Sequence, residues 1–250
     1  MNGVQVREDG PVRRVTLNRP KTRNALTPDD LRDLREAFTV GEHVKAVVLD
    51  AAGERAFCAG MNVDAFLALD SEAEARTFID GLRELLRTVR TAPVTTVCAI
   101  DGYCLGAAFE LVLACDLRVA TTRAAFGLPE IKLGIPSVVD AALLQQYVGL
   151  ALAKEIILTG DPYPAASLAG ICTAVVEPGE LGPRVDELLT KVTGHTRTVL
   201  AAQKRLFETW QNTGLADGAL ASVDEFATTF AAPETREQLA SYRAALGSRR

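Results

Sequence analysis

Glu110 is the residue of this chain whose surroundings most call for a chemical explanation. It lies in the stretch GAAFELVLAC, residues 106–115, where every other residue from Ala107 to Cys115 is apolar. A carboxyl group in such surroundings must be paired, protonated or functional, because an isolated buried charge is very costly. Two explanations are open: an ion pair with a nearby arginine such as Arg118 or Arg123, or a catalytic acid or base.

A second acid in similar surroundings is Glu130. It follows Pro129 in FGLPEIKLGIP, residues 126–136, and is flanked by apolar residues on both sides. If Glu110 and Glu130 face one pocket, they form a pair of carboxyl groups that can hold a water molecule and divide the roles of acid and base.

Two glycine-marked loops could supply hydrogen-bond donors to the same place. In ERAFCAGMNVDAF, residues 54–66, Gly60 allows a tight bend that would leave the amide of Met61 free. In IDGYCLGAAFE, residues 100–110, a helix is expected to open at Gly106 and Ala107, so its first amides lack intrahelical acceptors. Two such amides converging on one oxygen would make an oxyanion hole. Each loop taken alone is also explained by ordinary turn chemistry.

The remaining reactive residue types show no site pattern. His43 and His195 have no partner at metal-ligand spacing, and the five cysteines show neither paired zinc spacing nor a CxxC motif. We therefore expect no metal, and expect the cysteines to be reduced core thiols. The chain has no GxSxG, GxxxxGK[ST] or GxGxxG motif. Asp140 is expected either to be a charge near a helix N-terminus or to face the pocket.

The elements that would position these residues alternate between strands and helices. Residues 4–18 predict a hairpin around the turn EDG, and residues 44–53 and 94–102 predict two buried strands. A helix capped by Thr27 is expected to run to about Phe38, and a second from about Ser71 to before Pro93. This order predicts an α/β fold with a mostly parallel sheet, and both glycine loops follow its strands.

The second half of the chain is expected to be mainly helical. After the helix at Gly106, short strands are predicted within 117–121 and 124–130, and one late strand within 171–180. Helical patterns dominate from Val138 and are continuous from about residue 183. The region from about 190 to 250 is the expected appendage to the main domain.

Composition excludes several classes of protein. The chain has 250 residues, 48% of them hydrophobic and 24% charged, with a net charge of -5, which is typical of a soluble globular protein. No basic stripe is present, so no nucleic-acid partner is expected; the scattered basic residues leave a small anionic ligand open. No signal peptide or membrane-spanning run is found, and we expect a cytoplasmic protein that does not enter a membrane.

Five motifs, taken together, resemble the successive signatures of the enoyl-CoA hydratase/isomerase (crotonase) superfamily over residues 4–210. They are NRPKTRNAL, FCAGMNVDAF, AIDGYCLGAAFELVLACDLRVAT, AFGLPEIKLGIP and YVGLALAKEIILTG. The resemblance implies a crotonase-like spiral of ββα units over residues 1–190, forming two roughly perpendicular sheets and holding an acyl-CoA thioester site. It implies a C-terminal helical region, residues 191–250, that mediates assembly of a homotrimer, or of a hexamer as a dimer of trimers. It implies no separate cofactor, since coenzyme A is part of the substrate.

The resemblance also assigns the chemistry. In the hydratase branch it implies that Met61 and Ala107 donate to the thioester oxygen, while Glu110 and Glu130 activate one water for syn addition to a 2-enoyl-CoA. Glu130 would then supply the proton to the α-carbon and Glu110 would orient the water.

Further residues match the positions that hold coenzyme A and the thioester. The basic pair Lys21 and Arg23, with Ala25 and Leu26, fits the loop at the nucleotide end, while Ala59 and Asp64 flank the pantetheine path. Lys204 and Phe207 match a C-terminal helix that reaches the coenzyme A of a neighbouring subunit; a solvated surface charge is the alternative for the basic residues. The remaining expected binding residues surround the thioester: Gly60, Asn62, Gly106 and Pro129.

The motifs depart from the family pattern in three places. Asn62 stands where many relatives have aspartate, Ala107 and Ala108 replace two glycines, and GIPSVVDAALL replaces the usual PGxGGTQRL. These changes touch the acyl pocket, so the sequence fixes neither the acyl group nor the pathway. The alternatives to a hydratase are an enoyl-CoA delta isomerase on the same scaffold, which usually needs one acid, and a non-catalytic acyl-CoA-binding oligomer.

Overall fold

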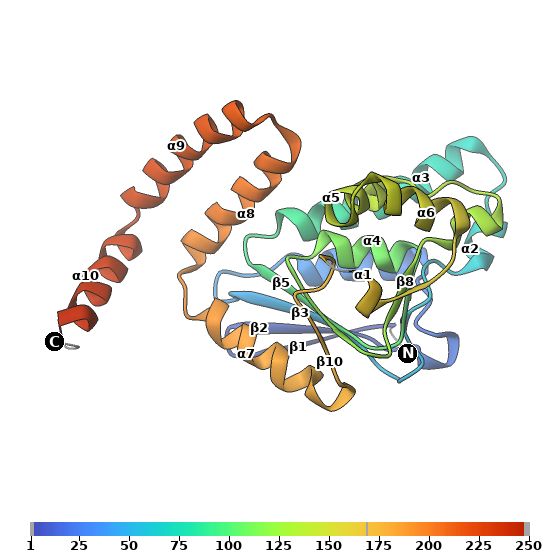
Figure 1. Ribbon diagram of the computed structural model, residues 1–250, viewed down its shortest axis with the longest axis horizontal. Coiled ribbons are helices and arrows are strands. Elements are labelled where there is room, and N and C mark those ends of the chain that lie inside the picture. Colours follow the sequence, from blue (N-terminus) through green and yellow to red (C-terminus); the bar gives the residue numbers. More distant parts are fainter. Residues whose placement is uncertain (1–2, 169, 248–250) are drawn as a thin grey trace.

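The computed structural model describes residues 3–168 and 170–247 and contains two β-sheets surrounded by helices (Figure 1). The strands are β1 Val4–Asp9, β2 Val12–Leu17, β3 Ala46–Ala51, β4 Ala56–Cys58, β5 Thr95–Ile100, β6 Tyr103–Leu105, β7 Leu117–Thr121, β8 Ala125–Gly127, β9 Tyr163–Pro164 and β10 Ala174–Val176. The α-helices are α1 Pro28–Phe38, α2 Val63–Leu67, α3 Glu72–Thr91, α4 Ala107–Ala114, α5 Leu144–Val148, α6 Leu150–Thr159, α7 Leu181–Thr193, α8 Arg197–Asn212, α9 Leu215–Ala231 and α10 Pro233–Gly247. Five short 3-10 helices are η1 Pro20–Thr22, η2 Pro129–Leu133, η3 Val139–Leu143, η4 Ala165–Ser167 and η5 Pro178–Glu180.

From β3 to β8, successive strands along the chain alternate between the two sheets. The larger sheet has the order β1-β2-β3-β5-β7-β10 and the smaller one β4-β6-β8-β9. Thus β3, β5 and β7 join the large sheet, and β4, β6 and β8, which follow them, join the small one. Apart from the β1–β2 hairpin and the β8–β9 pair, the strands run parallel. The α/β class and the ββα arrangement are therefore confirmed.

The large sheet is covered on both faces, which explains why its central strands are almost uniformly apolar. On one face, Val47 and Leu49 of β3 pack in the main core with α1, α3 and α4. On the other, Ala46 and Val48 pack with residues of α7, including Val185.

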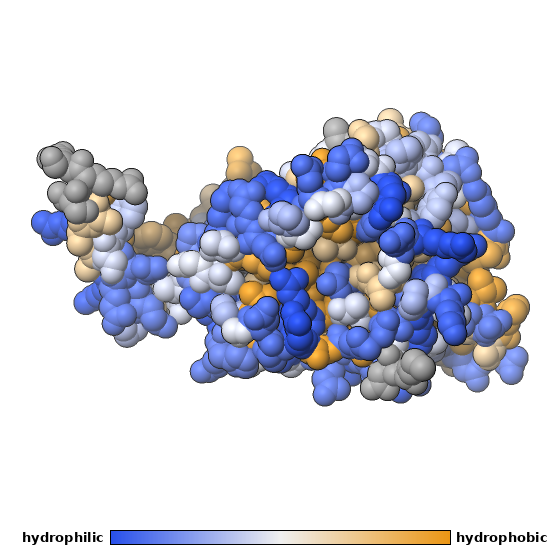
Figure 2. Space-filling model, turned by 90° about the horizontal axis from the view of Figure 1, so that it is seen from below, coloured by the Kyte–Doolittle hydropathy of each residue, from blue (hydrophilic) through white to orange (hydrophobic). Residues whose placement is uncertain are grey.

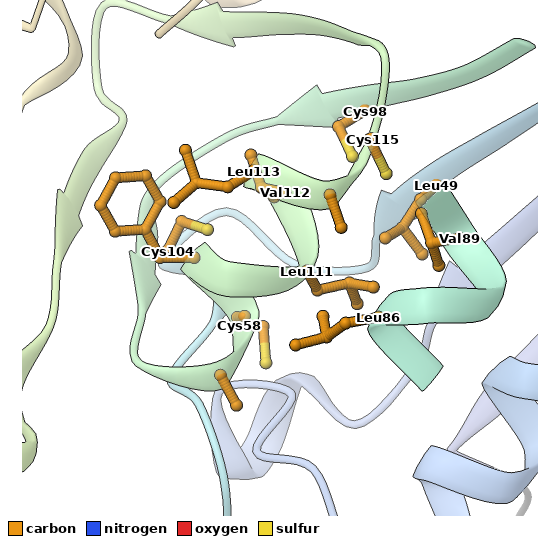
Figure 3. Close-up of a cluster of buried hydrophobic side chains, with 14 of the residues drawn as sticks. Leu49, Cys58, Leu86, Val89, Cys98, Cys104, Leu111, Val112, Leu113 and Cys115 are labelled. Carbon is orange, nitrogen blue, oxygen red and sulfur yellow. The ribbon is translucent and has the colours of Figure 1, made fainter. Parts of the chain in front are cut away.

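Helix α4 lies at the centre of the main core. All eight of its residues are buried, and Figure 3 shows Leu111, Val112 and Leu113 among side chains of β3, α3 and β5. Cys98 and Cys115 lie together in this cluster. All five cysteines are free, and burial raises the pKa of Cys58 to about 12, which fits unreactive thiols in the core.

The later a C-terminal helix comes in the chain, the farther it lies from the sheets. The predicted division at residue 190 falls within α7, which still packs on the large sheet, while α8 packs against α3. Helices α9 and α10 extend away from the sheets (Figure 1). Several of their large apolar side chains are exposed: Leu215, Leu220, Val223, Phe226, Phe230, Leu239, Tyr242 and Leu246. Trimerisation through this region stays a prediction.

Two further properties concern the molecule as a whole. Among the residues described, no helix combines the length and the hydropathy needed to cross a membrane. Figure 2 shows a face on which polar side chains surround a patch of apolar ones near the middle of the body.

Candidate active site

The two glycine loops lie directly against each other. Gly60 has φ +91° and Gly106 has φ +57°, both in the region that favours glycine. A Cβ placed on Gly60 would lie 2.8 Å from the carbonyl oxygen of Leu105, so the loops can approach this closely only because position 60 has no side chain. The sequence prediction that both loops meet at one place is thus matched by the geometry.

A short strand-like contact fixes the first loop. Leu26 N donates to the Gly60 oxygen at 2.8 Å, and Asn62 N donates to the Leu26 oxygen at 2.8 Å. Met61 lies between these two bonds, and within the described part of the chain neither its N–H nor that of Ala107, the first residue of α4, has an acceptor. Both amides therefore remain available to a ligand oxygen.

Glu110 forms no ion pair with any of the residues that the structure describes. Its residue is 2% exposed, and its Oε2 atom has no hydrogen-bond partner among the described residues. Arg118 donates instead to carbonyl oxygens, among them those of Val112 and Ile171, and Arg123 pairs with Asp101. Burial, followed by the charge of Glu130, raises the pKa of Glu110 well above its usual value. The ion-pair explanation is therefore excluded.

Glu130 approaches the same place from the short helix η2. A Cβ at position 106 would lie 2.7 Å from its Oε1 atom, and Ser137 Oγ donates to its Oε2 atom at 2.9 Å. Burial raises the pKa of Glu130, while hydrogen bonds from its own backbone and from Ser137 oppose that rise. One carboxyl oxygen thus lies beside the start of α4 and the other is held by Ser137.

Both carboxyl groups line one pocket with a largely apolar wall. Gly60, Met61, Gly106 and Ala107 also line it, and it contains about 540 Å³ of empty space, partly open to solvent. Phe66 of α2 packs on Phe78 of α3 with ring centroids 5.1 Å apart. The rest of the apolar wall comes mainly from Ile79, Leu82, Leu133 and Ile135. Such a pocket suits an apolar group attached to a polar head that reaches the two amides.

The loop predicted to hold the nucleotide end of coenzyme A is hydrogen-bonded to the first glycine loop. Lys21 and Arg23 are exposed, while Leu26 is buried and Ala25 partly so. Ala59 N donates to the Arg23 oxygen at 3.0 Å. Asn24, which the sequence analysis did not single out, has φ +54° and donates from its side chain to the oxygens of Ala52 and Phe57. Only its setting among turn residues could have drawn attention to it.

The predicted residues near the pantetheine path have different roles here. Asn62 caps α2, because its Oδ1 atom accepts from Asp64 N at 2.9 Å. Asparagine therefore serves as a helix cap at this position. Asp64 is exposed and does not line the pocket, whereas Ala59, Gly60 and Pro129 do.

Lys204 and Phe207 lie away from this pocket. Lys204 is buried, with Nζ 2.9 Å from Asp116 Oδ2 and 3.0 Å from the Val89 oxygen. It is therefore not a solvated surface charge. Phe207 is partly exposed and contacts Trp210. Both line a second cavity between α8 and the body, and their predicted contact with a neighbouring subunit's coenzyme A stays a prediction.

The sequence analysis missed two residues that act near the carboxyl pair. One is Ser137, whose hydroxyl donates to Glu130, and the other is Arg90, which pairs with Asp140 on η3. Asp140 is buried but does not line the pocket, and it lies in the first turn of η3, so of its two predicted settings the one near a helix N-terminus is observed. Within the described residues, no group of three or more His, Cys, Asp or Glu side chains could hold a metal ion.

Comparison with known proteins places this arrangement in a family. The family model described as enoyl-CoA hydratase/isomerase matches residues 7–246, and the chain belongs to that family. It is 30% identical to a short-chain-enoyl-CoA hydratase of Clostridium acetobutylicum, over 97% of this chain and 95% of that protein. It is 29% identical to a crotonyl-CoA hydratase of Syntrophomonas wolfei, over 90% of this chain and 89% of that one.

Solved structures agree in fold. An enoyl-CoA hydratase of Mycobacterium smegmatis superposes with a TM-score of 0.92 at 27% identity, covering 98% of this chain and 97% of that one. One from Bacillus anthracis has a TM-score of 0.90 at 25% identity, with coverages of 98% and 97%. The crotonase fold expected from the sequence motifs is thus confirmed.

Proposed function

We propose that this chain is an enoyl-CoA hydratase that adds water to a 2-enoyl-CoA and gives a 3-hydroxyacyl-CoA. The observation that carries the proposal is the placement of two carboxyl groups, the buried Glu110 and the partly buried Glu130, in one pocket beside the free amides of Met61 and Ala107. The names of the similar proteins, a short-chain-enoyl-CoA hydratase and a crotonyl-CoA hydratase, support the same reaction.

The two amides act on the thioester oxygen. Their N–H groups stabilise the negative charge that this oxygen acquires when the β-carbon is attacked, and the dipole of α4 adds to the effect. Removal of one such donor typically costs about 3 kcal/mol of transition-state stabilisation.

The two carboxyl groups share one proton. Glu130 is the acid for the α-carbon because its Oε1 lies next to Gly106, close to the amide that binds the carbonyl oxygen. Water loses a proton to ionised Glu110, its hydroxide forms the bond to the β-carbon, and protonated Glu130 delivers a proton to the α-carbon. The proton that ends on Glu110 then returns to Glu130, which restores the starting state.

Burial separates the basicity of the two groups. The pKa of Glu110 is raised well above its usual value, whereas the hydrogen bond from Ser137 opposes the rise in the pKa of Glu130. Glu110 is therefore the stronger base and Glu130 the stronger acid. The shared proton thus rests mainly on Glu110, and the reactive form is the less populated one in which Glu130 carries it. Two neighbouring carboxylates in a largely apolar pocket also resist double ionisation, which favours the singly protonated pair.

The binding residues follow from the same proposal. The exposed cations Lys21 and Arg23, with Ala25 and Leu26 of their loop, hold the nucleotide end of coenzyme A, and Ala59 and Asp64 flank the pantetheine. The residues that border the thioester are Gly60, Asn62, Gly106 and Pro129. The acyl chain enters the apolar wall around Phe78 and Leu82, and the limited space there favours a short chain.

The assembly belongs to the proposal as well. The exposed apolar side chains on α9 and α10 would be buried between copies of the chain in a homotrimer or a dimer of trimers. Lys204 and Phe207 would then contact the coenzyme A of a neighbouring subunit. A cytoplasmic location and activity in fatty-acid or other acyl-CoA metabolism remain predictions.

The test is the loss of enoyl absorbance when crotonyl-CoA is added to the purified protein. We expect rapid loss with the wild type, and a decrease in kcat of about 100-fold or more in both Glu110→Gln and Glu130→Gln. Unchanged turnover of Glu130→Gln would rule out the two-carboxyl mechanism.

A delta isomerase is the second candidate, because the family includes isomerases. It requires a single acid at the α-carbon, so Glu110→Gln would keep isomerase activity on a 3-enoyl-CoA. Conversion of a 3-enoyl-CoA without loss of crotonyl-CoA would favour the isomerase. Absence of both reactions with retained binding of acyl-CoA would indicate a non-catalytic binding protein.

A further inference from the structure

A third carboxyl group lies behind the pair. Asp140 is 8% exposed and belongs to η3, which packs on α4. Its backbone N–H lies within reach of the Glu110 carboxyl group and lowers the pKa of that carboxyl, against the larger effect of burial. The position of Glu110 therefore depends on the conformation of the turn that carries Asp140.

That turn is strained. Val139, directly before Asp140, has φ +42°, a conformation that a β-branched residue rarely adopts. Such a conformation persists only when the surroundings enforce it. The Asp140 side chain provides the enforcing contact, because its Oδ2 atom accepts a hydrogen bond from the guanidinium of Arg90 on α3.

Arg90 connects this turn with two other elements. It lies near the end of the long helix α3, and its Nε also pairs with Glu208 Oε2 of α8 at 3.3 Å. The charged groups that face Glu110 are thus Glu130 from η2 and Asp140 from η3, with Arg90 and then Glu208 behind Asp140. The charge of Asp140 raises the pKa of Glu110, and the Arg90 cation paired with Asp140 opposes that effect.

We propose that Asp140, anchored by Arg90, is a positioning residue that holds the Val139–Asp140 turn in place, aims its N–H at Glu110 and balances the charge behind it. The inference rests on the proposed hydratase function. It assigns a role to two residues that do not contact the substrate, one of them in the segment GIPSVVDAALL that departs from the family pattern.

Opposite charge changes give the sharpest test. Asp140→Asn keeps the shape but removes the anion that raises the pKa of Glu110, which favours the ionised form of the carboxyl pair. Arg90→Gln leaves the Asp140 anion unbalanced, which favours the protonated form. The midpoints of the kcat–pH profile with crotonyl-CoA should move to lower pH in the first variant and to higher pH in the second, by about half a unit or more.

The double variant separates charge from geometry. Asp140→Asn with Arg90→Gln has no net charge change, so its pH profile should return toward the wild type. Its kcat should stay about 10-fold or more below the wild type, because the turn has lost its anchor, while KM changes little. Asp101→Asn is the matched control: it breaks a similar pair with Arg123, neither residue of which lines the pocket, and should leave the profile unchanged.

The proposal fails if the two single variants shift the profile in the same direction, or if both keep the wild-type kcat and profile and lose only thermal stability. If Asp140→Asn does not fold, as judged by circular dichroism, the upward shift of Arg90→Gln decides alone. If the wild type does not hydrate crotonyl-CoA, the proposed function has failed. The positioning role can then still be tested by ¹³C NMR titration of labelled glutamate, with Glu110→Gln identifying the resonance.

Discussion

Glu130 Oε1 lies where a side chain on Gly106 would have to be: a Cβ built at position 106 comes within 2.7 Å of this oxygen. The Glu130 carboxyl group therefore occupies the space that a side chain at position 106 would need. Gly106 also has φ +57°, and it directly precedes the amide of Ala107. One glycine thus makes room for the acid and orients the donor.

Gly106→Ala should therefore abolish activity. The added methyl group displaces Glu130 and strains the backbone, so we expect kcat to fall by about 100-fold or more and stability to fall by about 1–3 kcal/mol. Gly10→Ala is the control, since Gly10 has the same φ of +57° with open space around it. It should lose some stability and keep full activity; equal activity losses in both variants would contradict this account.

Leu82→Ala should change the preference for acyl chain length. Leu82 is buried and lines the pocket, so its truncation enlarges the acyl space. The kcat/KM of an eight-carbon enoyl-CoA relative to crotonyl-CoA should rise by about 10-fold. Leu85→Ala, on the same helix but outside the pocket lining, is expected to lose a similar 2–5 kcal/mol of stability (about the usual range for such changes) without changing the preference. A matching change in Leu85→Ala would refute the assignment.

Glu110→Gln should stabilise the protein at neutral and alkaline pH. The pKa of Glu110 in the folded chain lies above that of an unfolded glutamate, about 4.3. The folded state therefore binds this proton more tightly, and stability is lost as pH rises from about 4.3 through the folded pKa. The variant lacks this loss, so its Tm should exceed that of the wild type at pH 8, with the difference shrinking toward pH 4.

Thermal unfolding followed by circular dichroism across this pH range measures the effect. Glu72→Gln, at an exposed carboxylate of α3, serves as the control and should show no comparable trend. A Tm difference that grows as pH falls would have the wrong sign for a buried, unpaired carboxyl group.

Ser137→Ala should shift the pH dependence of turnover upward. The Ser137 hydroxyl donates to Glu130 Oε2 at 2.9 Å and lowers the pKa of this carboxyl. Its loss raises that pKa, so the acid limb of the kcat–pH profile should move to higher pH, with kcat reduced by less than in Glu130→Gln. Ser167→Ala, whose hydroxyl donates to the Pro164 oxygen instead, is the control. A downward shift would disprove the role of Ser137.

Phe226→Arg should disrupt self-association. Phe226 on α9 is 70% exposed in the single chain and stacks on Phe230. A charge there should shift the sedimentation coefficient from that of a trimer or hexamer toward that of a monomer. Thr228→Arg, at a neighbouring exposed polar position, is the comparison and should remain assembled. A monomeric wild type would contradict the proposal that α9 and α10 form an interface between subunits.

The sequence predicted the parts of the fold that depend on local pattern. The turn in the hairpin, the cap at Thr27 and the apolar run around Glu110 each carry their signal in a few adjacent residues. The strands β4, β6 and β9 were not predicted. β4 and β6 lie inside the two glycine loops, whose turn residues dominate the local pattern, and β9 has only two residues.

The residues of the site also fall into those that a local sequence pattern predicted and those that it did not. Glycine loops and isolated acids were visible in the sequence, and the motifs joined them into one expected pocket. The pairs Arg90–Asp140 and Lys204–Asp116 join residues far apart in the chain, and neither partner has a local pattern that points to the other. Lys204 was predicted to reach the coenzyme A of a neighbouring subunit, with a surface charge as the alternative, and nothing near it in the sequence marks it as buried.

The alternation of strands between two sheets has a consequence for how the chain folds. Some neighbouring residues of the large sheet are far apart in the sequence, such as Ala46 and Thr95 or Val119 and Ala174. The segment between the two partners contributes strands to the small sheet, so the partners pair only after a long loop has closed. High contact order of this kind slows folding, because loop-closure entropy is lost before the pairing is gained. The first glycine loop precedes β5 and the second follows it, so neither loop can reach its final conformation before β5 has paired. The catalytic centre should therefore form late in folding, in one cooperative step with the packing of α4.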